Sequence, residues 1–466
     1  MTTAKRPIAV IGAGFSGTIA TLHLLRLLPA DQPVLLCERA PEFARGVAYA
    51  TGESGHLLNV RATNMSALAD DPEHFANWLK RRPTGGESLH STDSGLFASR
   101  GLYGEYLRDI LDFAMRESAA RAQLRLMPGD VTDVQPAPRG GFELVIAGAE
   151  AVEVAGIVLA VGNLPPEEHP NPRVCANPWD EKALDGLSGD APVLIVGTGL
   201  TMADLAISLR RRGFAGKIIA ISRGGLLPAR HAAVTPWPTP HFTLAEEESL
   251  PLLMARLRDE VFAAAQQGVG WRGVIDSLRP ITAGLWRRLP LAERRRFLRH
   301  ARRYWDVHRH RMAPPNADLI ESWMREGSLE VVSGRISAVV PGAAAVDVHY
   351  TPRGGGAETT VSVQRVIMAS GVEHISRSRD PLMARLLDQG LIRVDQQGLG
   401  LDVTDELNVV RADGSASDRI WALGPIVRGV FWECVAVPDI RVQASHVAAS
   451  VVARLRQDAP RRSLLM

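Results

Sequence analysis

The sequence predicts an α/β protein with two Rossmann-like, three-layer domains and a helical insertion in the second domain. Two strand–loop–helix–strand units support this prediction. In the first unit, a β-branched run at 8–11 leads into a glycine loop, a helix over 16–28 with apolar residues at helical spacing, and a strand at 34–37. The second unit begins with the apolar strand at 193–196 and continues through a loop, a helix and a strand to residue 221. Each unit predicts its own parallel sheet.

Two further apolar runs indicate how the domains are arranged along the chain. The runs at 157–162 and 365–371 both end in small residues and lie on either side of the second unit. This order is typical of a first domain that is interrupted by a second one. We therefore expect a first domain of 1–165 plus 372–455 and a second domain of 190–226 plus 326–371.

Residues 227–325 lose the strand pattern and take on helical spacing, so we expect a helical insertion there. It opens with the proline-rich stretch 235–240, which cannot form helix or central strand because proline lacks an amide donor. The glycine triplet 354–356 predicts a hairpin turn, and 456–466 predicts a flexible tail.

The composition gives no indication of nucleic acid or a membrane as partner. The chain has 466 residues, 46% of them hydrophobic, with 53 basic against 51 acidic residues. No apolar run approaches the ~20 residues of a membrane helix, and no export signal is evident, so we expect a cytoplasmic protein. The cysteines Cys37, Cys175 and Cys434 are too far apart for a metal site or a Cys-x-x-Cys pair.

The first glycine loop has the pattern Gly12-x-Gly14-x-x-Gly17, placed between a strand and a helix. Such a loop lets backbone amides approach a pyrophosphate at a helix N-terminus. Glu38 ends the next strand, where a carboxylate can bind ribose hydroxyls. We therefore expect a dinucleotide here. The residues expected to bind it in this unit are Gly12, Gly14, Phe15, Ser16, Gly17, Glu38 and Arg39.

The second loop, Gly197-Thr-Gly199-Leu-Thr201-Met202, keeps two glycines and loses the third. Its partner strand ends in Ser222 and Arg223 instead of an acid. A cation at that position favours a 2′-phosphate, so NADPH is expected over NADH, with a solvated Arg223 and use of either cofactor as the alternative. The residues expected to bind NAD(P)H are Gly197, Gly199, Thr201, Met202, Ser222 and Arg223.

Several runs resemble a known flavoprotein family. They include Gly46-Val-Ala-Tyr49, the segment from His56 to Pro72, Trp305 to Met312, and Pro438-Asp-Ile-Arg441. The chain resembles the group that contains the HpyO-type FAD-dependent urate hydroxylases and the CreE-type amine monooxygenases, and more distantly the ornithine and lysine N-hydroxylases. The resemblance implies FAD at the first loop. It also implies ring-side roles for Asn59, Met65 and Leu68, with ordinary loop and core packing as the alternative, and further FAD contacts at Gly162 and Gly424.

Where relatives have Gly-Asp, this chain has Gly424-Pro425, so the aspartate contact is missing. Trp432, Glu433 and Pro438 follow and are expected either at the flavin face or in the core. The arginine-dense stretch 287–311 is expected to be a solvated or interdomain helix, with attraction of an anion as the alternative. Neither a metal nor nucleic acid is expected there.

If both cofactors bind, hydride passes from NAD(P)H to FAD, and molecular oxygen is the expected acceptor because no redox cysteine pair exists. The resemblance favours a monooxygenase that uses a flavin C4a-hydroperoxide on a small polar nucleophile, with urate to 5-hydroxyisourate as the first hypothesis. An amino-acid or amine N-hydroxylase is an alternative. An NAD(P)H:acceptor reductase or redox-sensing flavoprotein is another. Oligomeric state is left open.

Overall fold

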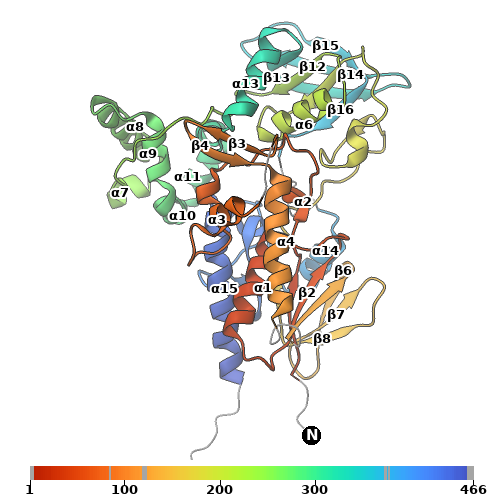
Figure 1. Ribbon diagram of the computed structural model, residues 1–466, viewed down its shortest axis with the longest axis vertical. Coiled ribbons are helices and arrows are strands. Elements are labelled where there is room, and N and C mark those ends of the chain that lie inside the picture. Colours follow the sequence, from red (N-terminus) through yellow and green to blue (C-terminus); the bar gives the residue numbers. More distant parts are fainter. Residues whose placement is uncertain (1–4, 83–85, 118–122, 372–374, 376–377, 459–466) are drawn as a thin grey trace, which may run out of the picture.

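The computed structural model describes residues 5–82, 86–117, 123–371, 375 and 378–458. It contains two Rossmann-like sheets that lie at opposite ends of the molecule, with a helical segment at its side (Figure 1). The predicted fold class is confirmed. No helix within the described ranges is both long and apolar enough to cross a bilayer.

The first sheet takes strands from both ends of the chain. Its central strand β1 pairs in parallel with β2 on one side and β9 on the other. The C-terminal strand β18 pairs in parallel with β9, and β17 closes that edge in antiparallel orientation. The strand order is β17 (Asn408–Val410), β18 (Ala416–Ala422), β9 (Gly156–Leu159), β1 (Ile8–Ile11), β2 (Val34–Glu38) and β5 (Leu124–Pro128).

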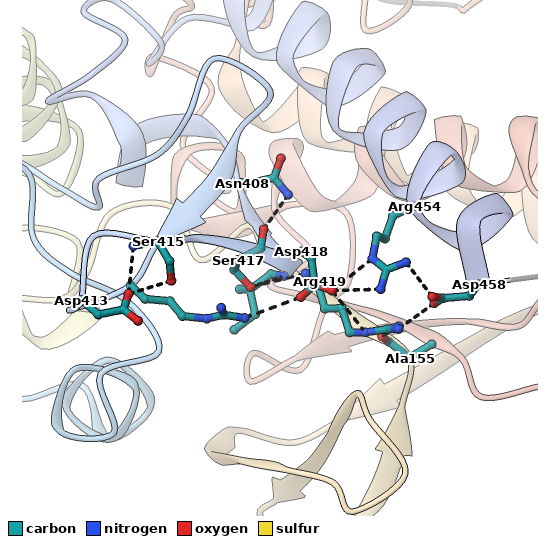
Figure 2. A network of polar contacts seen from close by, with 11 residues as sticks. Ala155, Asn408, Asp413, Ser415, Ser417, Asp418, Arg419, Arg454 and Asp458 are labelled. Carbon is teal, nitrogen blue, oxygen red and sulfur yellow. Dashed lines mark hydrogen bonds and ion pairs between the residues drawn. The ribbon is translucent and has the colours of Figure 1, made fainter.

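Three long helices run alongside this sheet: α1 (Phe15–Leu27), α4 (Arg100–Arg116) and α15 (Val437–Asp458). Helix α1 packs against both α4 and α15 (Figure 1). The far end of α15 is fastened to β18, because Arg454 pairs with Asp418 and Asp458, and Asp458 also pairs with Arg419 (Figure 2). Helix α15 therefore continues past residue 455, and residues 459–466 of the expected tail lie outside the described residues.

Smaller elements complete this part of the chain. An antiparallel sheet of β6 (Val131–Pro136), β7 (Phe142–Ile146) and β8 (Val152–Val154) lies beside α14 (Pro381–Asp388). The segment between β2 and α4 forms α2 (Gly46–Tyr49), η1 (Ala62–Asn64), α3 (His74–Lys80) and the hairpin β3 (Leu89–Thr92) with β4 (Gly95–Ala98). A short helix, η5 (Gly424–Val427), follows β18.

The second sheet has its parallel part around β11 and an antiparallel extension at one edge. Its order is β10 (Val174–Cys175), β16 (Arg365–Met368), β11 (Val193–Val196), β12 (Ile218–Ser222), β13 (Leu329–Pro341), β14 (Val346–Pro352) and β15 (Thr359–Val363). Helices α6 (Leu200–Arg211) and α13 (Pro314–Arg325) pack on it, and η2 (Glu181–Leu184) precedes β11. Strand β10 comes from before residue 190, where we expected this domain to begin. The expected boundary at 372 lies outside the described residues.

The glycine triplet lies between β14 and β15, which pair in antiparallel orientation, so the predicted hairpin turn is present. Residues 231–243, including the proline-rich stretch, form no helix or strand. The helical segment follows as α7 (Leu244–Glu247), α8 (Leu250–Gln266), α9 (Trp271–Ser277), α10 (Arg279–Arg288), α11 (Leu291–Arg296), the π-helical turn η3 (Phe297–Ala301) and α12 (Arg302–Arg309).

Candidate functional site

The first glycine loop turns tightly between β1 and α1, and two of its glycines are fixed by neighbouring backbone. Gly12 has φ of 97°, and a Cβ there would lie 2.6 Å from the carbonyl oxygen of Ala160. A Cβ on Gly17 would lie 1.8 Å from the carbonyl oxygen of Gly12. Gly17 therefore allows α1 to pack directly on the loop.

Gly14 has a different environment, because a Cβ there would meet only the Cα of Gly46, at an ordinary 3.6 Å. Gly14 is the N-cap of α1, with no side-chain cap and no acidic residue in the first turn. The first amides of this 13-residue helix thus have no side-chain acceptor, and the helix end attracts negative charge. This is the environment that a pyrophosphate requires, so the loop fits FAD.

Glu38 ends β2 beside this loop and is buried. Its carboxylate accepts hydrogen bonds from the backbone amides of Ala13, at 2.6 Å, and Ala40, at 2.9 Å. A carboxylate accepts about four hydrogen bonds, so Glu38 keeps lone pairs for ribose hydroxyls. The next residue, Arg39, pairs with Asp380 at 2.7 Å and Asp130 at 3.3 Å, which ties the end of β2 to α14.

Two segments remote in sequence meet the first loop or border it. Gly424, with φ of 80°, leaves so little room that a Cβ would lie 2.4 Å from Ser16 Oγ. Its amide donates to Gln443 Oε1 at 2.9 Å, and its carbonyl accepts from Cys434 Sγ at 3.1 Å. Gly162 has φ of 68°, and a Cβ there would meet no atom within 4 Å, so its surroundings are open. The structure thus brings Gly424 to Ser16.

The segment with Asn59, Met65 and Leu68 is held by three contacts from other parts of the chain. The Asn59 carbonyl lies 3.0 Å from His231 Nε2. The Ser66 carbonyl accepts from Arg441 at the start of α15, and the Tyr106 hydroxyl accepts from the Ala67 amide. Met65 and Leu68 are buried, whereas Asn59 is half-buried. Sequence reasoning missed His231, which no motif signals, and assigned Arg441 no role although its motif was recognised.

His231 lies where the helical segment meets this loop. The backbone around it is fixed, since its amide donates to the Met312 carbonyl at 2.9 Å, and its ring lies 5.2 Å from that of Phe97. Burial lowers the pKa of His231 to about 4, and the nearby Arg311 and Arg61 oppose protonation further, against the hydrogen bond to Asn59. The imidazole is therefore neutral at physiological pH.

The second loop repeats the backbone geometry of the first. Gly197 has φ of 123°, and a Cβ would lie 2.3 Å from the Ala369 carbonyl oxygen. Gly199 caps α6 without a side-chain acceptor, and a Cβ there would meet nothing within 4 Å. The loop is braced by Thr198, whose Oγ1 donates to the Leu226 carbonyl at 2.6 Å and lies 2.9 Å from Ser222 Oγ. The loop therefore fits a second pyrophosphate.

The remaining residues predicted for the second loop differ in accessibility. Met202 is fully buried in the core beneath α6, which leaves its side chain no route to a cofactor. Thr201 and Ser222 are half-buried, and the Ser222 hydroxyl accepts from the Gly225 amide at 3.0 Å. Arg223 is exposed at the end of β12. Of these side chains, Arg223 is therefore free to reach an anionic ligand.

Buried polar contacts join α6 to the first residue of α4 and to the segment before α4. Arg100 pairs with Asp204 at 3.1 Å, and His56 Nε2 lies 3.1 Å from the Asp204 carbonyl and 2.8 Å from Ser208 Oγ. Burial raises the pKa of Asp204, opposed by Arg100 and His56. His56 belongs to a motif quoted above and Asp204 follows the second loop by two residues, but their meeting could not be inferred from the sequence. These contacts fasten α6 of the second domain to α4 and to the segment before it.

Glu433 forms a second buried junction, between the helical segment and the turn before α15. It accepts from Trp305 Nε1 at 2.7 Å and pairs with Arg309 at 3.2 Å and His310 at 3.5 Å. Burial opposes its ionisation, but His310 and Arg309 outweigh burial and lower its pKa to about 2. Its φ is 75°, a strained value for a non-glycine residue. The arginine-dense stretch 287–311, expected as one helix, is divided among α10, α11, η3 and α12, and its last part makes interdomain contacts.

The chain has measurable similarity to known proteins. Residues 9–164 match the model of an FAD-NAD(P)-binding family. An uncharacterized protein of Mycobacterium tuberculosis is 22% identical, with 96% of each chain covered. Among solved structures, ornithine hydroxylase of Pseudomonas aeruginosa has 13% identity and a TM-score of 0.63, covering 97% of this chain and 100% of the other. L-lysine 6-monooxygenase of Pseudomonas syringae has 16% identity and a TM-score of 0.60, with the same coverage.

The chain shares the fold of the ornithine hydroxylase and of the L-lysine 6-monooxygenase. A cadaverine monooxygenase of Erwinia amylovora aligns similarly, with 11% identity and a TM-score of 0.61 over 97% of this chain and 95% of the other. The sequence match spans the first glycine loop and Glu38, and the structural matches span both sheets.

Proposed function

We propose that this protein is an FAD-dependent NAD(P)H monooxygenase that hydroxylates the nitrogen of a small amine or amino acid. The observation that carries the proposal is the pair of uncapped helix N-termini, at Gly14 and Gly199, each behind a glycine turn at the end of a parallel sheet. Two such sites in one chain suit two dinucleotides. The match of residues 9–164 supports FAD at the first site.

In this proposal, the loop of Gly12 and Gly14 holds the FAD pyrophosphate, Glu38 holds the ribose, and the Gly424 turn approaches from the other side. The loop of Gly197 and Gly199 holds NAD(P)H, with Arg223 free for a 2′-phosphate. Bound FAD accepts hydride from NAD(P)H and activates molecular oxygen. The protein's part is to position both cofactors and to exclude water, and the helical segment provides cover for that purpose.

The substrate assignment favours an amine over urate. The ornithine, lysine and cadaverine enzymes named above share the fold over 97% of this chain, whereas urate rests on sequence resemblance alone.

The cysteines do not support the alternative that the protein is an NAD(P)H:acceptor reductase with a dithiol. Cys37 and Cys434 are buried and Cys175 is half-buried, and all three are free. Burial raises the pKa of Cys37 to about 12, so it is not a thiolate nucleophile at neutral pH. The described residues therefore contain no pair of reactive cysteines that could pass electrons to an acceptor as a dithiol.

Anaerobic stopped-flow reduction tests the proposal. The purified protein is mixed with NADPH or NADH in the presence of L-ornithine, L-lysine, cadaverine or urate, and then with oxygen. We expect one amine to yield a hydroxylamine product with oxygen consumption coupled to NAD(P)H oxidation. Coupled oxidation of urate would overturn the amine assignment. Reduction that no compound affects, followed by release of hydrogen peroxide alone, would overturn the monooxygenase assignment.

A further inference from the structure

A group of exposed cationic side chains surrounds the turn that follows β12. Arg223 begins this turn, α12 brings Arg303, and Arg353 lies directly after β14. The Cδ atom of Arg303 lies 3.7 Å from the position that a Cβ on Gly224 would take. The Arg353 amide donates to the Ser333 carbonyl at 2.9 Å, and Ser333 Oγ donates to the Arg223 carbonyl at 3.5 Å. Three elements far apart in the sequence therefore bring an arginine each to this turn.

Tyr304 joins two of these arginines. Its hydroxyl accepts a hydrogen bond from Arg303 Nη2 at 2.9 Å, and the Arg303 guanidinium carbon lies 4.7 Å from the centre of its ring. Hydrogen bonds from Arg353 and Arg303 lower the pKa of Tyr304. A hydroxyl that accepts two hydrogen bonds still has its own proton to donate. The cluster thus offers a hydroxyl donor between two guanidinium groups, and all three side chains are exposed.

The cluster has no acidic counterpart of its own. Arg302, next to Arg303, pairs with Asp306 at 3.3 Å. Within the described part of the chain, Arg223, Arg303 and Arg353 form no ion pair with a carboxylate. Cations held close together repel one another, and an anion bound among them removes this repulsion. Arginine suits phosphate in particular, because its planar group donates two parallel hydrogen bonds to phosphate oxygens. The cluster therefore favours a phosphate group as its ligand.

We propose that Arg303, Tyr304 and Arg353 bind the 2′-phosphate of NADPH, so that this coenzyme links the helical segment to the second sheet. This inference rests on the proposed function, which places NAD(P)H on the second loop. Ser222 Oγ lies 2.9 Å from Thr198 Oγ1, so the turn after β12 borders that loop. The end of this strand is where such a domain holds the adenosine ribose. NADH has no 2′-phosphate and cannot form the link.

The first test uses the FAD-loaded full-length protein and two probes of equal charge. Adenosine 2′,5′-bisphosphate carries the phosphate in question, and adenosine 3′,5′-bisphosphate carries it on the neighbouring hydroxyl. Isothermal titration calorimetry measures their binding, with 5′-AMP as the probe without the second phosphate. We expect the 2′,5′ isomer to bind about 10-fold more tightly than the other two, as hydrogen bonds to a charged group provide. Equal affinity of the two isomers would overturn the proposal.

Variants locate the phosphate. Arg303→Ala and Arg353→Ala should each weaken binding of the 2′,5′ isomer about 5-fold and leave 5′-AMP unchanged, and Tyr304→Phe should act in the same direction. Arg295→Ala is the matched control, because Arg295 is exposed in the same arginine-dense stretch but lies in α11, two helical turns before α12. Losses no larger than in the control would overturn the proposal. The comparison of isomers on the wild-type protein remains decisive if a variant does not fold.

Amide hydrogen exchange tests the link between the helical segment and the sheet. At saturating coenzyme, NADPH should slow exchange in α12 and in the hairpin of β14 and β15 more than NADH does, because only NADPH joins them. Equal protection by both coenzymes would overturn the link.

Neither the calorimetry nor the exchange measurement requires turnover, so this inference and the proposed function fail in different ways. Binding of NADH and 5′-AMP without any preference for the 2′,5′ isomer would overturn this inference alone. Selective binding of the 2′,5′ isomer by a protein that hydroxylates no amine would support the phosphate site and overturn the proposed activity. Binding of neither coenzyme would overturn both, because the second loop would then hold no dinucleotide.

Discussion

The three glycines of the first loop have different structural roles, although the sequence motif does not distinguish between them. A Cβ at Gly17 would collide with the Gly12 carbonyl, whereas a Cβ at Gly14 would find ordinary space. Gly17 is therefore required by the packing of α1 on the loop. Gly14 instead leaves room for a ligand that approaches the N-terminus of α1 from outside the protein.

We expect Gly17→Ala to lower both folding stability and FAD content, because the helix must move away from the strand. Gly14→Ala should keep the fold and lose FAD, because its methyl group would occupy the path of the pyrophosphate. Absorbance at 450 nm per protein and circular dichroism measure the two effects. Gly52→Ala, with no neighbour within 4 Å, is the control. Full FAD content in Gly14→Ala would contradict our placement of the pyrophosphate.

Glu433 is a buried carboxylate that pairs with Arg309 and His310. Glu433→Gln should lower the free energy of unfolding at pH 7 by about 3 kcal/mol, because it leaves Arg309 buried without its carboxylate. Urea denaturation measures this loss. Asp405→Asn is the control: Asp405 pairs with Arg287, its side chain is 72% exposed, and such surface pairs contribute about 0–1 kcal/mol.

The same residue predicts a pH dependence. The pKa of Glu433 is about 2 in the folded protein against an ordinary 4.5, so its contribution is complete above pH 4.5 and is lost as the pH falls towards 2. The stability difference between wild type and Glu433→Gln should therefore shrink over that window. A difference that is constant from pH 5 to pH 3 would mean that the carboxylate does not stabilise the fold through its charge.

At the scale of single elements, α6 and β12 form the predicted NAD(P)H site. Arg223 is exposed at the end of β12, so its loss should leave the fold intact. We expect Arg223→Ala to raise the KM for NADPH roughly 10-fold or more, as loss of a charge-assisted hydrogen bond does, with the KM for NADH unchanged. Steady-state NAD(P)H oxidation measures both constants. An equal rise for both cofactors would indicate a general effect on the site.

The regular elements were predictable where periodicity was strong. The helix expected at 16–28 spans Phe15–Leu27. The strand expected at 193–196 is β11, and the strand expected to end at residue 221 is β12, which ends one residue later. Both signals are local, since a buried strand or amphipathic helix repeats its pattern over a few residues.

The candidate site was predictable only in part. The glycine turns could be located because their chemistry lies within one stretch of sequence. Met202, at the third position of the glycine pattern, remains a predicted cofactor residue, and the structure adds that its side chain is fully buried in the core on the inner face of α6. The contacts of His231 with Asn59 and of His56 with α6 join residues more than 140 positions apart, and no local pattern encodes them.

At the scale of the molecule, the two sheets are joined by the buried contact of Arg100 and Asp204. Asp204→Asn should lower the stability by about 3 kcal/mol and loosen the two sheets from each other, because Arg100 loses its buried partner. Urea unfolding monitored by circular dichroism and by FAD fluorescence should then give separate transitions. Asp185→Asn, which breaks the exposed pair with Arg212 near the same helix, is the control and should keep the wild-type curve. Coincident, unshifted transitions in Asp204→Asn would show that other contacts hold the sheets together.

The pairing of β18 with β9 has a consequence for biosynthesis. A ribosome releases β1, β2 and β9 long before β18 and α15, so the first sheet lacks its last strands and α1 lacks one of its two partner helices until nearly the whole chain has emerged. The strands of the second sheet lie within 174–368 and can assemble earlier. We therefore expect the nascent chain to fold from its middle outwards, with the N-terminal nucleotide loop completed last.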